Sequence, residues 1–249
     1  MLLLLGALAV IATIYALVNT STAARAAGSP ASETVVAEGR GLYLEGCASC
    51  HGLSAAGTSV APSLIGAGSA AVHFQLSTGR MPLAAPTVQA KRKAPTYEEP
   101  EILAMAAYVA TLGPGPAIPT AEQLDTTNAD LAVGGELFRT NCAQCHNFAG
   151  SGAALTRGKF APSLMDATPQ QVYEAMLTGP QNMPVFGEGT VTPEEKQDIV
   201  KYVAHLQTQT QPGGWDLGSF GPVTEGALLF TLALGVMAGF AIWIGAKVR

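Results

Sequence analysis

Apolar residues form long uninterrupted segments only near the two ends of the chain. No charged residue occurs from Gly226 to Ala246, and at about 1.5 Å per helical residue this stretch just spans a hydrocarbon core of roughly 30 Å. We therefore predict a transmembrane helix over residues 223–246. Lys247 and Arg249 follow it, and positive residues tend to stay on the cytoplasmic side. The pattern predicts a cell-membrane protein with a cytoplasmic C-terminus and its preceding domains on the outer face.

The apolar segment at residues 1–20 is more ambiguous. Its run from Leu2 to Val18 is at the short limit for a membrane span, and Ala24-Arg25-Ala26 shortly afterwards resembles a signal peptidase site. A secretory signal normally opens with a basic region, which is not seen before this run. A cleaved signal and a retained anchor both stay open, and we favour a second transmembrane helix.

Between these segments the hydrophobic positions recur with helical spacing. The clearest examples are Ile102 to Leu112 and Glu194 to Leu206, the latter with Thr192 as a candidate N-cap before Pro193 at the first helical position. No clear alternating pattern typical of strands is present. The soluble part is therefore predicted to be all-α with long loops.

The chain contains an internal repeat built around two C-x-x-C-H strings. Gly39 and Gly134 each lie eight residues before the first cysteine of their string, and Tyr43 and Phe138 each lie four residues before it. This spacing places both positions on one face of a short helix. The sequence thus predicts a tandem duplication of one helical domain.

Further elements follow in the same order in both copies. They are Ala-Pro-Ser-Leu at 61–64 and 161–164, a Thr-Gly element leading to Met81-Pro82 and Met183-Pro184, and Tyr-Val-Ala-x-Leu at 108–112 and 202–206. The first copy has extra residues after Met81 and the second has extra residues after His146, which we expect in surface loops. We predict domains at 34–113 and 129–207, joined by a Pro-rich linker at 114–128, and a loop from Gln207 to Pro222.

The amino-acid composition of the chain narrows the classes of function that it could have. Charged residues make up only 12% of the chain and the net charge is -5, so no basic patch supports binding to nucleic acid. Domains of fewer than about 100 residues bury proportionately little of their own surface. A bound apolar group in each domain would supply part of the missing core.

All four cysteines fall in the two C-x-x-C-H strings, whose members are Cys47, Cys50 and His51, and Cys142, Cys145 and His146. In this motif the two sulfurs can attach to one haem, and the adjacent histidine can bind its iron. A single C-x-x-C would also fit a thiol redox pair or half of a zinc site. Two copies in matched surroundings favour two covalently bound haem c groups.

A sixth iron ligand decides whether a haem transfers electrons or binds small molecules. Met81 and Met183 are the candidates, since each is followed by proline and preceded by a Thr-Gly element. A thioether ligand raises the haem potential and closes the site. Met105 and Met176 lack this context and are interpreted as core residues.

A histidine that binds iron needs an acceptor for its other ring nitrogen. Pro62 and Pro162 occupy the same relative place in both copies, so their carbonyls are candidate acceptors for His51 and His146. A plain role in a loop turn is the alternative. We therefore include both prolines among the candidate haem-binding residues.

The remaining candidates are favoured as structural. His73 aligns with Tyr173 and is interpreted as a packing or haem-edge residue, because ligation there would duplicate Met81. His205, in the last turn of a predicted helix, is expected on a solvated face. The run Lys91 to Lys93 could dock an acidic partner or lie near haem propionates, but short charge runs are usually only solvated.

Two sequence strings and the segment before the last apolar run resemble a known protein family more specifically than the C-x-x-C-H strings do. They are Ser-Thr-Gly-Arg-Met-Pro at 77–82, Leu-Thr-Gly-Pro-Gln-Asn-Met-Pro at 177–184, and Gln-Pro-Gly-Gly-Trp followed by Gly-Ser-Phe-Gly-Pro before the last apolar segment. Together with two tandem class I cytochrome c domains, they resemble the dihaem cytochrome c subunit of the actinobacterial cytochrome bcc (quinol:cytochrome c reductase) complex over nearly the whole chain.

The resemblance implies that His51 with Met81, and His146 with Met183, bind the two irons. It further implies an electron-transfer subunit without a catalytic pocket of its own, which takes electrons from a Rieske iron-sulfur protein and passes them to the copper centre of a cytochrome oxidase. Its partners would be the cytochrome b subunit, the Rieske subunit, the copper-containing oxidase subunit and the lipid bilayer. The alternatives are a cytochrome subunit of another membrane dehydrogenase, or a dihaem peroxidase or sensor.

Overall fold

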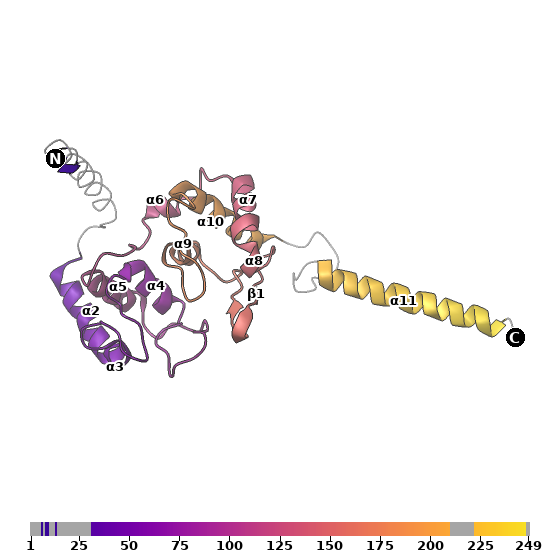
Figure 1. The fold of residues 1–249 in the computed structure, drawn as a ribbon, viewed down its shortest axis with the longest axis horizontal. Coiled ribbons are helices and arrows are strands. Elements are labelled where there is room, and N and C mark those ends of the chain that lie inside the picture. Colours follow the sequence, from indigo (N-terminus) through magenta and orange to yellow (C-terminus); the bar gives the residue numbers. More distant parts are fainter. Residues whose placement is uncertain (1–5, 7, 10–12, 14–30, 210–221, 248–249) are drawn as a thin grey trace. The chain divides into compact units, whose positions relative to one another are not determined.

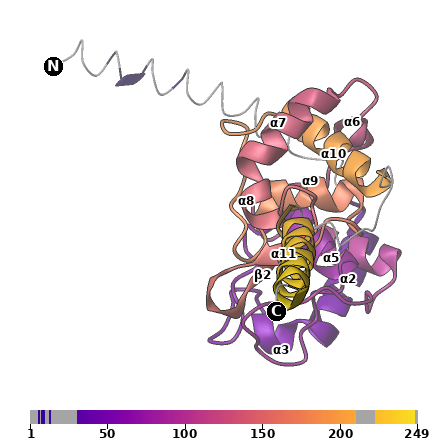
Figure 2. The same cartoon turned by 90° about the vertical axis from the view of Figure 1, so that its right-hand side faces the viewer.

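The computed structural model describes residues 6, 8, 9, 13, 31–209 and 222–247. Contacts group the chain into two compact units, Met1–Glu122 with Tyr173–Thr190, and Gln123–Val172 with Val191–Arg249. Helices make up most of the described structure (Figures 1 and 2), which confirms the all-α prediction. Apart from residues 6, 8, 9 and 13, the predicted N-terminal membrane segment lies outside the described residues, as do the candidate peptidase site and residues 210–221.

The first unit is built on three main helices that follow one another along the chain. Its elements are α2 (Glu33–Gly46), α3 (Ala48–His51), α4 (Gly68–Ser77) and α5 (Glu99–Ala110), with the short α6 (Ala121–Leu124) at its boundary. The Ser32 side chain accepts a hydrogen bond from the Val35 N–H and so caps α2. Both α2 and α4 pack against α5 (Figure 1).

A glycine lets α2 and α5 approach closely. A Cβ atom placed on Gly39 would overlap the carbonyl of Ala104 in α5. One turn later, Tyr43 stacks on Tyr108 with ring centroids 5.3 Å apart. Both Gly39 and Tyr43 are buried, which confirms that these two positions share one helix face. The close crossing and the aromatic pair form the centre of this unit.

The second unit repeats this design with its own helix pair. Its elements are α7 (Leu131–Asn141), α8 (Ala143–His146), β1 (Ala153–Ala154), η1 (Thr156–Gly158), β2 (Phe160–Ala161), α10 (Pro193–Thr208) and α11 (Pro222–Lys247). Helix α9 (Pro169–Thr178) begins in this unit and ends in the first. Helices α7 and α10 lie side by side in both views (Figures 1 and 2).

The α7–α10 contact matches the α2–α5 contact residue by residue. A Cβ on Gly134 would overlap the carbonyl of Asp198, and Phe138 stacks on Tyr202 with centroids 5.3 Å apart. Thr192 caps α10 by accepting from the Glu195 N–H, as the sequence predicted. The helix continues through Thr208, so the predicted loop begins two residues later than expected. The duplication therefore extends from sequence to packing.

Two short strands depart from the expectation of no strands. Strand β1 pairs antiparallel with β2, with Ala153 opposite Ala161. Both lie in the extra residues that follow His146 in the second copy. A two-residue strand is too short to show an alternating pattern, which is why the sequence did not reveal it.

Helix α11 is apolar on all sides. Thr224–Lys247 has a mean hydropathy of 2.3 and none of its apolar window is buried. A helix that exposes apolar side chains around its whole circumference suits a bilayer rather than water. Among the described residues it is the one helix long and apolar enough to span a membrane, in agreement with the prediction of a C-terminal transmembrane helix.

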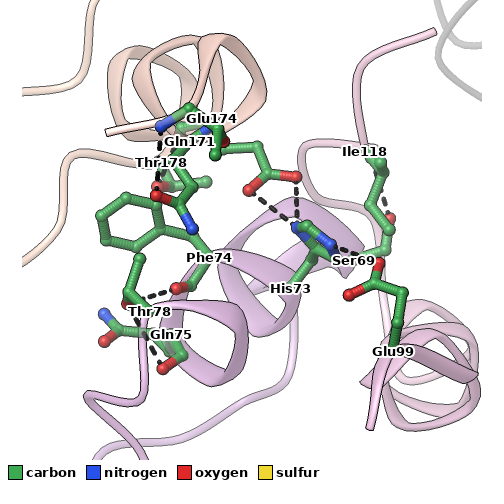
Figure 3. Close-up of polar contacts among 11 residues, drawn as sticks. Ser69, His73, Phe74, Gln75, Thr78, Glu99, Ile118, Gln171, Glu174 and Thr178 are labelled. Carbon is green, nitrogen blue, oxygen red and sulfur yellow. Dashed lines mark hydrogen bonds and ion pairs between the residues drawn. The ribbon is translucent and has the colours of Figure 1, made fainter. Parts of the chain in front are cut away.

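A buried ion pair connects α4 to α9 within the first unit. The His73 Nδ1 lies 2.7 Å from Oε1 of Glu174, and its Nε2 lies 2.9 Å from Oε1 of Glu99 in α5 (Figure 3). The side chain of Glu174 is completely buried, while that of Glu99 is 58% exposed. Burial alone would lower the pKa of His73, but the hydrogen bonds and charges of Glu174 and Glu99 outweigh it and raise that pKa.

This pairing shows that the compact units do not follow the two sequence copies throughout. Glu174 belongs to the second copy, yet Tyr173–Thr190 groups with the first unit. His73 is buried, in agreement with its interpretation as a packing residue. The boundaries 34–113 and 129–207 remain a prediction for the limits of the repeats.

We expect Gly39→Ala and Gly134→Ala each to destabilise the protein by about 1–3 kcal/mol, because an added methyl group must push two helix backbones apart. Urea unfolding followed by circular dichroism measures the effect. Gly41→Ala in the same helix α2 is the matched control, since a Cβ there meets nothing within 4 Å. That variant should gain roughly 0.5–1 kcal/mol from helix propensity. Equal changes in unfolding free energy for Gly39→Ala and Gly41→Ala would refute the role of Gly39 in the close approach of α2 and α5.

The His73 ion pair makes stability depend on pH. Because its pKa is raised on folding, its contribution is fully present below about pH 6.5, the unfolded value, and is lost as pH rises through the folded pKa. His73→Gln should cost about 3 kcal/mol or more at low pH, since it leaves Glu174 buried without a cation. The difference between wild type and variant should shrink as pH is raised. A difference that is constant from about pH 5 to pH 9 would contradict a charged His73.

Candidate haem attachment sites

Each C-x-x-C-H string sits where one helix ends and a short one begins. Cys47 ends α2 and starts α3, and its N–H donates to Tyr43 O at 2.9 Å. Cys142 does the same between α7 and α8, with its N–H 2.8 Å from Phe138 O. The aromatic pairs of the helix crossings therefore lead directly into the two motifs.

The four cysteines are unpaired, and two of them have no reactive character. Burial, and to a smaller extent the neighbouring cysteine, raises the pKa of Cys47 and raises that of Cys142 to about 11. Redox-active thiols instead have lowered pKa values. Among the described residues no three His, Cys, Asp or Glu side chains are grouped to hold a metal ion, which disfavours a zinc site.

Each motif histidine donates a hydrogen bond to the predicted proline. The Nδ1 of His51 lies 2.8 Å from Pro62 O, and the Nδ1 of His146 lies 2.9 Å from Pro162 O. Since a carbonyl only accepts, Nδ1 carries the proton and Nε2 keeps its lone pair. Burial lowers the pKa of His146, and the bond to Pro162 only partly offsets this. A neutral imidazole with a free Nε2 is a metal ligand.

The loop that brings each proline to its histidine is held by matching backbone hydrogen bonds. The N–H groups of Gly57 and Gly152 donate to the carbonyls of His51 and His146, both at 2.9 Å. Further along, the N–H of Leu64 donates to Ala55 and that of Leu164 to Gly150. The loop between each histidine and its proline acceptor is thus held by the same backbone hydrogen bonds in both copies.

Met81 is half-buried and lies beside the first attachment site. It packs against a cluster of Leu76, Ile102 and Met105, and Cys47 packs against the same cluster. A thioether and an attachment thiol therefore border one apolar surface. Met105 and Met176 are each only 2% exposed, which confirms their interpretation as core residues.

The Thr-Gly elements end the helices that precede Met81 and Met183. Thr78 and Thr178 each donate a side-chain hydrogen bond to the carbonyl four residues earlier, at 2.6 and 2.8 Å. Gly79 and Gly179 follow with φ of 64° and 56°, a left-handed conformation that glycine adopts without strain. These turns stop the helices and lead the chain toward the methionines.

The structure does not test every pair of iron ligands that the sequence predicts. Met183 is half-buried in Tyr173–Thr190, which groups with the first unit, whereas His146 belongs to the second, so their pairing remains a prediction. Lys91 to Lys93 are exposed, as expected for a solvated run, although Lys93 Nζ donates to Pro82 O at 2.6 Å. His205 lies in the last turn of α10, as predicted.

Sequence reasoning missed two charged residues that are buried. Glu174 was not recognised because its partner His73 lies 101 positions away. Arg80 is 6% exposed, and the one signal for it was its place directly before Met81. Burial and the positive charge of Arg92 both lower its pKa. Its Nη1 has no hydrogen-bond partner in the described structure.

The donor set in the first site fits a covalently bound haem c. Two free thiols, an imidazole with Nε2 available and a thioether beside the same apolar cluster are the groups that this cofactor needs. The second site repeats the thiols and the oriented imidazole.

Comparison with protein families agrees with this chemistry. The model for "Cytochrome c" matches residues 36–113. The model for "Cytochrome C oxidase, cbb3-type, subunit III" matches residues 129–203. Both copies are therefore cytochrome c domains, which bind haem c covalently. The matched ranges correspond closely to the predicted domains at 34–113 and 129–207.

Curated relatives extend the similarity to almost the whole chain. The cytochrome bc1 complex cytochrome c subunit of Mycobacterium leprae is 44% identical over 252 residues, covering 99% of this chain and 87% of the relative. The subunits of Mycobacterium bovis and Corynebacterium diphtheriae are 45% and 44% identical, over 93% and 86% of this chain and 85% and 82% of their own lengths. This chain therefore belongs to the family of respiratory cytochrome c subunits of the cytochrome bc1 complex.

Proposed function

We propose that this chain is the dihaem electron-transfer subunit of a membrane-bound quinol:cytochrome c reductase. It takes electrons from the Rieske iron-sulfur subunit in its first domain and delivers them from its second domain to the copper centre of a terminal oxidase. The observation that carries the proposal is the duplicated site, in which a thiol pair and an imidazole oriented by proline recur in two cytochrome c domains. No separate soluble cytochrome c is then needed.

In the first domain the residues divide the work of holding the cofactor. Cys47 and Cys50 would attach it, and His51 through Nε2 and Met81 through its thioether would bind its iron. Pro62 keeps the imidazole in the required tautomer and orientation. Bound haem c supplies reversible one-electron chemistry at iron. The protein contributes a closed site that excludes competing ligands.

In the second domain Cys142, Cys145 and His146 have the same roles, with Met183 as the sixth ligand. The pKa of His146, which burial lowers, supports this, because a lowered pKa favours the neutral imidazole whose lone pair iron requires. The two domains thereby form a chain of two one-electron carriers.

Helix α11 anchors the domains, with the C-terminus in the cytoplasm and both haem domains on the outer face. Lys247 lies over the ring of Trp243, 4.6 Å from its centroid. Tryptophan and lysine at one end of an apolar helix are typical of a membrane interface. The partner subunits are a cytochrome b, the Rieske protein and the copper-containing oxidase subunit.

Two rival functions predict different experimental results. A cytochrome subunit of another membrane dehydrogenase would share the haem sites but not the partners. A dihaem peroxidase or sensor would require an open iron position instead of a methionine. The half-buried Met81 beside the Cys47 cluster favours a closed first site.

The ligand assignment predicts that Met81→Leu and Met183→Leu each lower the potential of one haem. The shift should be on the order of 0.1 V, a fraction of the roughly 0.8 V over which axial ligands set haem potentials. Redox titration of the purified protein measures both haems. Met176→Leu, in the same unit but outside the cluster that contacts Met81, is the control, because replacing a buried core methionine should leave both potentials unchanged. Rapid carbon monoxide binding to the reduced wild type would show that a site is open and would sink the two-methionine assignment.

The partner assignment predicts that the affinity-tagged chain co-purifies with a cytochrome b, a Rieske protein and a copper oxidase after mild detergent extraction. Membranes should then oxidise quinol with oxygen and without added cytochrome c. Cys142→Ser is a useful variant, since weakened haem attachment in the second domain should block oxygen uptake while quinol still reduces the first haem. Recovery of the chain with a different dehydrogenase, and no cytochrome b, would favour the rival function.

A further inference from the structure

Arg80 is a buried cation for which the described structure offers no anion. Its side chain has only 6% residue exposure, and Nη1 lacks any hydrogen-bond partner. Its one specific contact is with the ring of Phe74, whose centroid lies 4.9 Å from the guanidinium carbon. The other charge that acts on it is Arg92, which is also positive. Two cations therefore repel each other here, and the described structure shows no ion pair between Arg80 and a carboxylate.

Such an arrangement is unfavourable unless an anion completes it. Removing a guanidinium from water carries a large desolvation penalty, and the face of one phenylalanine ring compensates only a small part. The contrast with His73 is informative, because that buried cation has carboxylates on both ring nitrogens. Arg80 therefore marks a place where a negatively charged group that is not part of the chain is expected.

The position of Arg80 identifies that group. Arg80 immediately precedes Met81, and Met81 shares its apolar cluster with the attachment residue Cys47. A haem held by Cys47 and Met81 brings two propionate carboxylates into this neighbourhood. Guanidinium binds carboxylate through two parallel hydrogen bonds, for which an unused buried Nη1 is suited.

We propose that Arg80, supported by the charge of Arg92, binds a propionate of the first haem and raises the potential of that haem. This proposal rests on the proposed function, because it requires a haem at Cys47 and Cys50. A propionate favours ferric iron, and pairing it with a cation removes part of that effect. The second copy has Asn182 before Met183, so it lacks a cation at the position equivalent to Arg80. The pair between Arg80 and a propionate therefore raises the potential of the first haem relative to that of the second.

The experiment is a redox titration of full-length protein carrying Arg80→Met, Arg80→Gln or Arg80→Lys. For the two neutral variants we expect the ferrous-to-ferric ratio of one haem to fall about tenfold at a fixed potential, equivalent to about 59 mV for one electron. Lysine should restore part of the shift, since it keeps the charge but not the planar fork. The other haem is an internal reference and should not move. Arg40→Met, at an exposed position in α2, is the matched control.

Thermal unfolding of the same haem-loaded proteins gives an independent readout. If Arg80 has no anion, replacing it with methionine removes a buried unpaired charge and should raise the unfolding midpoint. If it binds a propionate, the midpoint should fall. Unchanged potentials together with a raised midpoint in Arg80→Met would overturn the proposal.

Failure of this inference can be told from failure of the proposed function. A haem stain on denaturing gels reports attachment, and the charge-transfer band of methionine-ligated ferric haem reports the Met81 bond. Two attached haems with the methionine band intact, but no shift in either neutral variant, would refute the role of Arg80 alone. Wild-type protein without haem at Cys47 and Cys50 would refute the proposed function. Arg80→Gln is also neutral but keeps a hydrogen-bond donor. The redox titration can therefore be done even if Arg80→Met fails to fold or to attach its haems.

Discussion

The hydrogen bond from a motif histidine to a proline carbonyl is the constraint around which each domain is organised. In the first copy this bond joins residues 11 positions apart, and in the second it joins residues 16 positions apart. The lengths are nevertheless 2.8 and 2.9 Å. The extra residues of the second copy are taken up by β1, η1 and β2, while the loop ends stay in place. An insertion was tolerated only where it left the imidazole orientation unchanged.

The helix crossings provide the rigid support for that bond. Gly39 and Gly134 allow two helix backbones to touch, and the stacked aromatic pairs one turn later lie directly before the attachment cysteines. A ligand bonded covalently to one helix end needs such a fixed frame, because a loose cysteine would place the iron unpredictably relative to both axial residues. Packing of glycine against carbonyl thus contributes to the redox site without touching it.

Local signals explain what could be predicted from the sequence. Thr192 and Pro193 begin a helix by capping rules, and the spacing of Gly134 and Phe138 defines one helix face, so these features need no tertiary information. The proline acceptors were predictable because the repeat presents the same residue twice. By contrast, the partnership of His73 with Glu174 joins the two copies across 101 positions and has no symmetric counterpart, because Tyr173 aligns with His73 and Phe74 aligns with Glu174. Asymmetric long-range contacts leave no mark on an internal repeat.

The buried charges show how two copies of one domain acquire different properties. His73 and Arg80 are both buried and both lie on or just after α4, but His73 is neutralised by carboxylates of the chain itself whereas Arg80 is not. The first pair consolidates the fold, and its energy is independent of any cofactor. The second charge has a stabilising role only when an external anion is present, so its energy is linked to the loaded state. If the proposed ligands are right, a duplicated scaffold keeps the same ligand types in both domains while one unmatched cation separates the potentials of the two haems.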